Sequence, residues 1–227
     1  DVTHCRQKIR KHNKTNSNKI SFNGWLISVI SRTIKKHENT SSFLYGKKKL
    51  IIFNDINVSL IVEKKVNWQK VPIPLVIEKA DNTSIESISK QIADAKMEEM
   101  TTKDIVLNKK ARLLENIYFL LPGFIRRYFW RYLLTHPKLA YKRMGNVAIT
   151  SVGMMGNVDG WFIPTSVHPI CFGLGAIVKK PVVVDNNIEI REILKMTILL
   201  DHDVIDGAPM ARFISELSKN IERSLLL

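Results

Sequence analysis

The sequence predicts an α+β fold in which helices cover a mixed or antiparallel sheet, within a single domain spanning residues 1–227. Three observations support this prediction. Apolar residues recur at helical spacing in roughly the first hundred residues and again near the C-terminus. From about residue 146 to residue 200, short apolar runs are separated by turn residues, as is typical of strands. Hydrophobic residues make up 45% of the 227 residues, which is enough for a sizeable core.

Composition also limits the partners and the compartment. The formal net charge is +14, but lysine and arginine are spread along the chain without a known binding motif, so we expect no nucleic-acid partner. Cys5 and Cys171 are far apart, which argues against a disulfide scaffold and, with no recognisable signal peptide, favours a cytoplasmic protein. No cysteine and histidine spacing suggests a metal site. The longest apolar run, 117–125, is too short to span a bilayer.

The N-terminal region predicts two helices. Asp1–Thr3 is compatible with the end of a strand, and the basic segment 5–14 is compatible with a helix. Apolar residues at helical spacing from Phe22 to Ile34 predict a core-facing helix with Ser21 as its N-cap. Strands are then expected at 50–53, 56–62 and 71–77.

The last of these strands is expected at a sheet edge, because Pro72 and Pro74 have no N–H to donate. A capping-box pattern from Thr83 to Glu86 follows it and predicts the start of another helix. The residues of that helix expected to face the core are Ile85, Ile88, Ile92 and Ala95.

The segment 107–143 differs from its surroundings. An apolar stretch is interrupted at Pro122-Gly123, and the stretch that follows combines aromatic residues with arginines at 126, 127 and 131. We interpret this segment as an inserted helical hairpin. It is either a packed subdomain or a binding surface, which would overhang a substrate channel or lie on a membrane.

The second half of the chain predicts strands and a closing helix. Strands are expected at 147–150, 170–178, 182–184 and 193–200, with a hairpin turn at Asp185-Asn186-Asn187. The closing helix is amphipathic, and its apolar residues at helical spacing are Met210, Phe213, Ile214, Leu217 and Ile221.

The junction between the last strand and this helix carries the clearest chemical signal. His202 lies there with three carboxylates, those of Asp201, Asp203 and Asp206, within four residues. Loops that follow strands are where folds often place reactive groups. Asp206 is placed to cap the helix that Ala208-Pro209 opens. An imidazole in this position is a candidate general base.

The residues 201–209, Asp-His-Asp-Val-Ile-Asp-Gly-Ala-Pro, resemble the active-site signature of the chloramphenicol acetyltransferase superfamily. Within it, the chain is most similar to the catalytic domain of the dihydrolipoamide acyltransferases of 2-oxoacid dehydrogenase complexes. Further segments resemble that family in the same order: 1–3 with the basic helix after it, 56–60, 71–74, 147–156, 171–177 and 180–185. The exception is roughly residues 105–145.

The resemblance implies a chloramphenicol acetyltransferase-like fold, assembled as a homotrimer or a larger assembly of trimers. It also implies a coenzyme A-dependent acyltransferase, which moves an acyl group between coenzyme A and a thiol or hydroxyl acceptor. Coenzyme A or acyl-coenzyme A is then a substrate, and neither a covalently bound cofactor nor a metal is expected.

The resemblance also assigns roles to residues. His202 matches the family's general base, and Asp206 matches the residue that orders the site by side-chain bonding. Aligning Gly153–Gly156 with the family's Gly-Met-x-Gly places Thr150 at the serine that donates a hydrogen bond to the oxyanion. Ser151 is the alternative donor, because the family has Ser-Asn where this chain has Thr-Ser.

Two departures bear on the function. Asp203 stands where the dehydrogenase-complex enzymes usually have arginine. Residues 1–227 contain no recognisable lipoyl or subunit-binding domain, and because of the 107–143 insertion we expect a stand-alone acyltransferase rather than a fragment. The alternative is a catalytically idle trimeric scaffold or regulatory binding protein of the same fold. The sequence does not identify the acyl group, the acceptor or the residues that bind coenzyme A.

Overall fold

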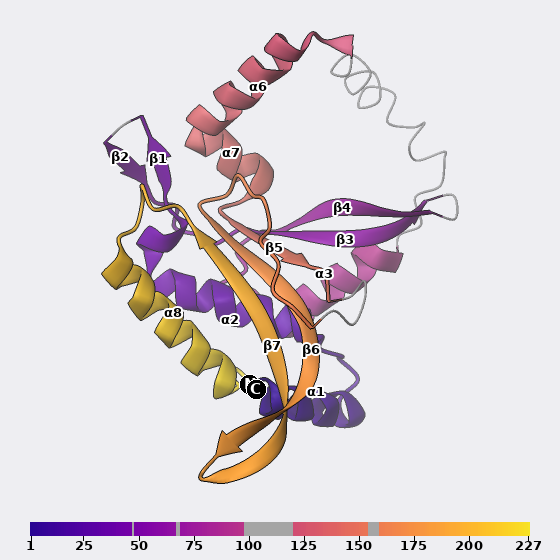
Figure 1. Cartoon of the computed structure of the whole chain (residues 1–227). Coiled ribbons are helices and arrows are strands. Elements are labelled where there is room, and N and C mark those ends of the chain that lie inside the picture. The colour runs from indigo at the N-terminus through magenta and orange to yellow at the C-terminus, as the bar shows by residue number, and fades with distance from the viewer. Residues whose placement is uncertain (47, 67–68, 98–119, 154–158) are drawn as a thin grey trace.

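The computed structural model in Figure 1 describes residues 1–46, 48–66, 69–97, 120–153 and 159–227. In spatial order, the main sheet contains β4 (Gln69–Ile77), β3 (Val58–Val66), β5 (Val147–Ser151), β6 (Ile170–Val184) and β7 (Asn187–Leu200). β5 runs parallel to both of its neighbours, whereas β3 with β4 and β6 with β7 are antiparallel pairs. The predicted mixed sheet is confirmed, and β4 lies at its edge as its prolines require.

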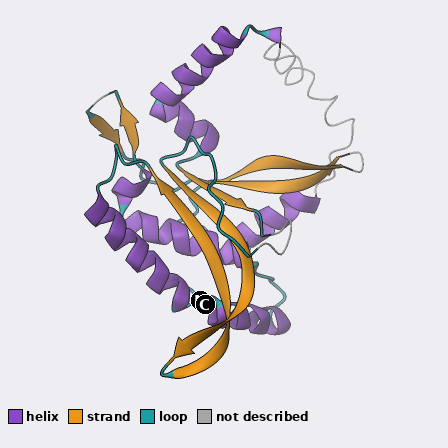
Figure 2. Ribbon diagram, viewed as in Figure 1, coloured by secondary structure: helices purple, strands orange, loops and turns teal. Residues whose placement is uncertain are grey.

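Helices cover one face of this sheet. They are α1 (Thr3–Thr15), α2 (Phe22–Lys36), α3 (Ile85–Met97) and α8 (Gly207–Glu222). Figure 2 shows them gathered along the strands, with α6 (Gly123–Thr135) and α7 (Pro137–Met144) apart from this layer at the top of the view. The short helix η1 (Glu38–Ser41) leads into a small sheet of β1 (Phe43–Tyr45) and β2 (Lys49–Ile51).

The core lies between the helix layer and the sheet. Side chains alternate between the two faces of a strand, so every second residue can be buried against the helices. The sheet residues buried in this way include Val58, Leu60, Val62, Ile77, Val147, Ile149, Ile170, Phe172 and Leu174. Trp25 and Phe213 are fully buried on the helix side. The opposite face of the sheet is therefore available for a functional site.

Most predicted elements are confirmed, with differences at several positions. Thr3 begins α1 rather than ending a strand, although Val2 donates one backbone hydrogen bond to Glu192 of β7 at 2.8 Å. Ser84, not Thr83, caps α3, because its hydroxyl oxygen accepts from the Ser87 N–H at 3.2 Å. The two strands predicted at 170–178 and 182–184 form one long strand, β6.

The predictions at Ser21 and at the hairpin turn are confirmed. The Ser21 side chain accepts from the Gly24 N–H and caps α2. Asp185 and Asn186 have φ angles of 47° and 63°, which short polar side chains tolerate and which suit the tight turn between β6 and β7.

The predicted hairpin insertion is described only in part. Its first apolar stretch falls mostly within 98–119, outside the described residues, while the aromatic and arginine-rich stretch forms α6. A second helix, α7, follows at Pro137 and was not predicted. Among the described residues, no helix is both long enough and apolar enough to cross a bilayer.

A pair of neighbouring substitutions tests the helix-layer core. Phe213 is fully buried under the sheet, whereas Ile214 is 38% exposed. We expect Phe213→Ala to lower the free energy of unfolding by about 3–5 kcal/mol through lost burial and a new cavity. Ile214→Ala should cost less than about 1 kcal/mol. Urea unfolding of both variants measures the difference, and equal losses would contradict this arrangement of α8.

Candidate active site

A hydrogen-bonded turn presents His202 between β7 and α8. The Asp201 carboxylate accepts from the Asp203 N–H at 3.0 Å, and the Asp201 carbonyl accepts from the N–H groups of Val204 and Ile205 at 3.1 and 3.2 Å. Ile205 is buried and anchors the turn, while the His202 side chain is exposed. The turn therefore holds the backbone of His202 and leaves its imidazole accessible.

The middle of α8 is tied to the end of α2. Glu216 of α8 accepts from His37 at 2.9 Å and from Lys36 at 3.0 Å. The hydrogen bond from His37, with the one from Lys36, lowers the pKa of the Glu216 carboxyl below its usual range. The His37 ring also meets the edge of Phe213, with ring centroids 5.7 Å apart. These contacts fix the helix that follows the His202 turn.

Asp206 lies at the predicted N-cap position of α8, but its side chain does not make the predicted capping hydrogen bond. The backbone at Asp206 is extended. Its backbone carbonyl accepts the helical bond from the Met210 N–H at 3.1 Å. The carboxylate is exposed, as is His202 four residues earlier.

Thr150 lines a cavity of about 700 Å³ on the sheet face opposite the helix layer. The cavity floor consists of outward-facing strand residues, including Ser59, Ala148 and Cys171. Thr150 is paired with Gly173 of β6. A Cβ atom at Gly173 would lie 3.0 Å from Pro164 and 3.2 Å from Phe162, so the glycine allows the 162–164 segment to form a wall of this cavity.

Ser151, the alternative donor, faces the other side of the sheet. It lines a cavity of about 370 Å³ together with residues of α1 and the start of α2, including Arg6 and Phe22. The period-two alternation of β5 explains this difference, because Val147 and Ile149 are buried against the helices. The two hydroxyls cannot serve the same cavity.

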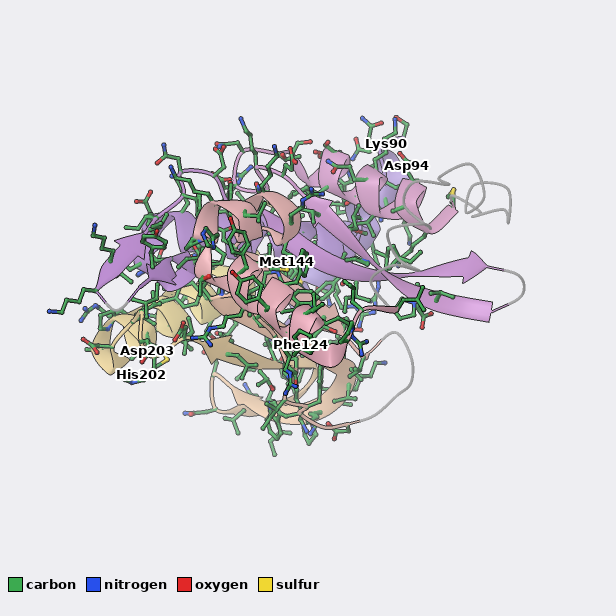
Figure 3. The ribbon with its side chains drawn as sticks, turned by 90° about the horizontal axis from the view of Figure 1, so that it is seen from above. Lys90, Asp94, Phe124, Met144, His202 and Asp203 are labelled. Carbon is green, nitrogen blue, oxygen red and sulfur yellow. The ribbon has the colours of Figure 1, made fainter. Side chains whose placement is uncertain are left out.

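Within one chain, the structure does not bring His202 into the cavity that Thr150 lines. Figure 3 shows His202 and Asp203 at the margin of the molecule, beside the start of α8. Met144, which lines the Thr150 cavity, lies well away from them in the same view. Among the described residues, no three His, Cys, Asp or Glu side chains gather in a way that could hold a metal ion.

His168 also lines the cavity that Thr150 lines. Its Nε2 lies 3.0 Å from the Met144 carbonyl oxygen, and its Nδ1 lies 3.0 Å from the Ser166 hydroxyl. Burial lowers the pKa of the His168 imidazole, which favours a neutral ring that donates to Met144 and accepts from Ser166. The ring thus connects the 166–168 segment to the end of α7. Only its place in the tertiary structure shows that it borders the same cavity as Thr150.

The chain matches the family described as 2-oxoacid dehydrogenases acyltransferase (catalytic domain) over residues 1–104 and 138–227. It is 25% identical over 212 residues to the lipoamide acyltransferase component of the branched-chain alpha-keto acid dehydrogenase complex of Bacillus subtilis. That match covers 92% of this chain and 41% of the relative, so the chain spans less than half of the relative's length.

Two solved structures share the fold. The Azotobacter vinelandii dihydrolipoamide acetyltransferase superposes with a TM-score of 0.67 at 19% identity, covering all of this chain and 81% of that one. It was studied for the roles of a serine, a histidine and an asparagine in its catalytic mechanism. A chloramphenicol acetyltransferase has a TM-score of 0.54 at 10% identity, covering 97% of this chain and 84% of that one. The predicted chloramphenicol acetyltransferase-like fold is confirmed.

The neutral, buried state of His168 predicts a pH dependence of stability. Its pKa is lower in the folded chain than in the unfolded chain, so the unfolded chain binds more protons once the pH falls below about 6.5. Wild type should therefore lose more thermal stability between about pH 7.5 and about pH 5.5 than His168→Gln, which cannot be protonated. Melting temperatures at both pH values measure this. The exposed His4→Gln variant is the control, and equal losses in wild type and His168→Gln would contradict the assignment.

Proposed function

The chain belongs to the acyltransferase (catalytic domain) family of the 2-oxoacid dehydrogenases, and from this we propose that it moves an acyl group between coenzyme A and a thiol or hydroxyl acceptor. Residues 1–227 form one catalytic domain, into which 107–143 is inserted. His202 is the general base, Thr150 is the oxyanion donor, and Asp206 orders the site. Coenzyme A enters as a substrate.

One observation carries this proposal, and it is the spacing of the three residues. Thr150 precedes His202 by the same number of residues that separates the serine from the histidine studied in the Azotobacter vinelandii enzyme. Asp206 follows His202 at the same interval as the asparagine studied there. Ser151 is one residue too close to His202 to match this spacing, and it faces the helix layer. Spacing and sheet geometry therefore both favour Thr150 over Ser151.

The chemistry uses two groups of this chain. The His202 imidazole removes the proton from the acceptor's thiol or hydroxyl as that atom attacks the thioester carbonyl carbon of acyl-coenzyme A. The carbonyl oxygen becomes an oxyanion, to which the Thr150 hydroxyl donates a hydrogen bond. When the carbon–sulfur bond breaks, the imidazolium returns the proton to the coenzyme A thiolate. A neutral hydroxyl suits the second role because it donates without protonating the intermediate.

His202 and Thr150 are brought together in this proposal by neighbouring copies of the chain, in a homotrimer or larger assembly of trimers. A site shared between two chains requires that each chain leaves its reactive group accessible to the other. The exposed His202 imidazole and the Thr150 hydroxyl on the uncovered sheet face meet this requirement. The end of the β6–β7 hairpin also projects past α1 and α8 (Figure 1). It exposes Val183, Ile188 and Ile190 by 73%, 79% and 74%. Apolar side chains exposed to this extent suggest that another chain covers the end of this hairpin in an assembly.

Three alanine variants test the assigned roles. His202→Ala should lower kcat by about 10²–10⁴-fold, with substrate binding nearly unchanged. Thr150→Ala should lower kcat by about 10²–10³-fold, because it removes the oxyanion donor. Ser151→Ala is the matched control and should lose much less. The measurement is release of the coenzyme A thiol from acetyl-coenzyme A with a panel of acceptors that includes dihydrolipoamide. A larger loss in Ser151→Ala than in Thr150→Ala would show that the assignment of the donor is wrong.

Mixing two inactive variants tests the shared site. Co-refolding equal amounts of His202→Ala and Thr150→Ala chains should restore about a quarter of the wild-type sites, because one neighbour then supplies each intact residue. No recovery, or a strict monomer in light scattering, would contradict the composite site. A trimer in which wild type transfers no acyl group to any acceptor would instead favour the scaffold or regulatory alternative.

A further inference from the structure

The cavity beside Thr150 is mainly apolar. Its volume of about 700 Å³ falls within the range of small-molecule sites. Apart from Thr150 and a few polar groups, its lining comes from side chains that cannot form hydrogen bonds. They include Ile61, Pro74, Val76, Phe162 and Pro164. An apolar ligand group gains more from such a lining than a polar one does.

One residue that lines this cavity, Trp130, lies outside the part of the chain that matches the family. The family match stops at residue 104 and resumes at residue 138, and α6 lies between these limits. Trp130 of α6 lines the cavity together with Ile61 and Pro74 of the sheet. Figure 3 looks down on α6, which lies over the strands in that view.

The helix that carries Trp130 is held through α7, which is docked on the domain. The ring of Tyr141 stacks on Phe53 with centroids 3.9 Å apart, and its hydroxyl donates to the Asp55 carbonyl at 3.1 Å. His168 holds the Met144 carbonyl at the other end of α7. In α6 itself, Leu133 is buried. Trp130 is thus positioned relative to Thr150 by contacts on the described part of the chain.

The outward side of α6 differs from the side that faces the cavity. Phe124 and Tyr128 are 66% and 70% exposed, and neither lines the cavity. The helix therefore offers an aromatic residue that borders the cavity and aromatic residues that do not.

We propose that Trp130 is a specificity-determining residue and that the cavity it borders binds an apolar acyl chain several carbons longer than acetyl. This inference rests on the proposed function, because it places the thioester carbonyl at the Thr150 hydroxyl. The carbon chain attached to that carbonyl then extends into the adjoining apolar space. An acetyl group would leave most of that space without an apolar partner, whereas a longer chain contacts the Trp130 indole.

The test uses a series of straight-chain acyl-coenzyme A thioesters from acetyl to octanoyl. Wild type should transfer hexanoyl groups with a higher kcat/KM than acetyl groups, and should bind hexanoyl-coenzyme A more tightly in calorimetry. Trp130→Ala should lose about tenfold in kcat/KM for hexanoyl-coenzyme A relative to acetyl-coenzyme A, the size expected for one missing apolar contact. Phe124→Ala, on the exposed side of the same helix, is the matched control and should keep the wild-type ratio.

The outcomes separate this inference from the proposed function. If wild type transfers acyl groups without regard to chain length, or if Trp130→Ala and Phe124→Ala change the ratio equally, the role of Trp130 is wrong while the acyltransferase function stands. If no thioester is turned over but hexanoyl-coenzyme A binds in a Trp130-dependent manner, the cavity assignment stands while the proposed function falls. Neither turnover nor chain-dependent binding would overturn both.

Discussion

The period-two alternation of side chains in the main sheet is the constraint on which the rest of this structure depends. Burying Val147 and Ile149 commits one face of β5 to the hydrophobic core. The residues between and after them, Ala148 and Thr150, must then face away from the helix layer. Strand pairing fixes the same division on β3 and β6. The open face is therefore a direct consequence of how the core is filled, and a hydroxyl there is accessible without any loss of packing.

The His202 turn has the two properties that the proposed mechanism requires of it. A side chain that takes part in proton transfer needs a defined backbone position and an accessible ring. The Asp201 hydrogen bonds and the burial of Ile205 supply the first requirement, and exposure of the imidazole supplies the second. In the proposed homotrimer, this exposed ring is completed as a site by the surface of a neighbouring chain.

The inserted segment connects to this arrangement through two helices with different roles. α7 is anchored by stacking on Phe53 and by the His168 contact with Met144. α6 extends from it and presents aromatic residues both toward the cavity and toward solvent. The sequence interpretation treated a packed subdomain and a binding surface as alternatives. In the described part of the insertion, α7 is docked on the domain as a packed subdomain would be. α6 carries exposed aromatic residues, and their role in binding stays a prediction.

By itself, the sequence determined the elements whose signals are local. The spacing of apolar residues located α2, α3 and α8, the prolines placed β4 at an edge, and the Asp185-Asn186 turn located the β6–β7 hairpin. The 201–209 motif likewise located the strand–turn–helix junction. Only the tertiary structure decided which hydroxyl faces the large cavity, that His168 borders it, and that His202 lies outside it within one chain. The physical reason is that these properties depend on which strand is paired with which and on which face the helices cover. Both are set by contacts between residues far apart in the sequence, and no local spacing records them.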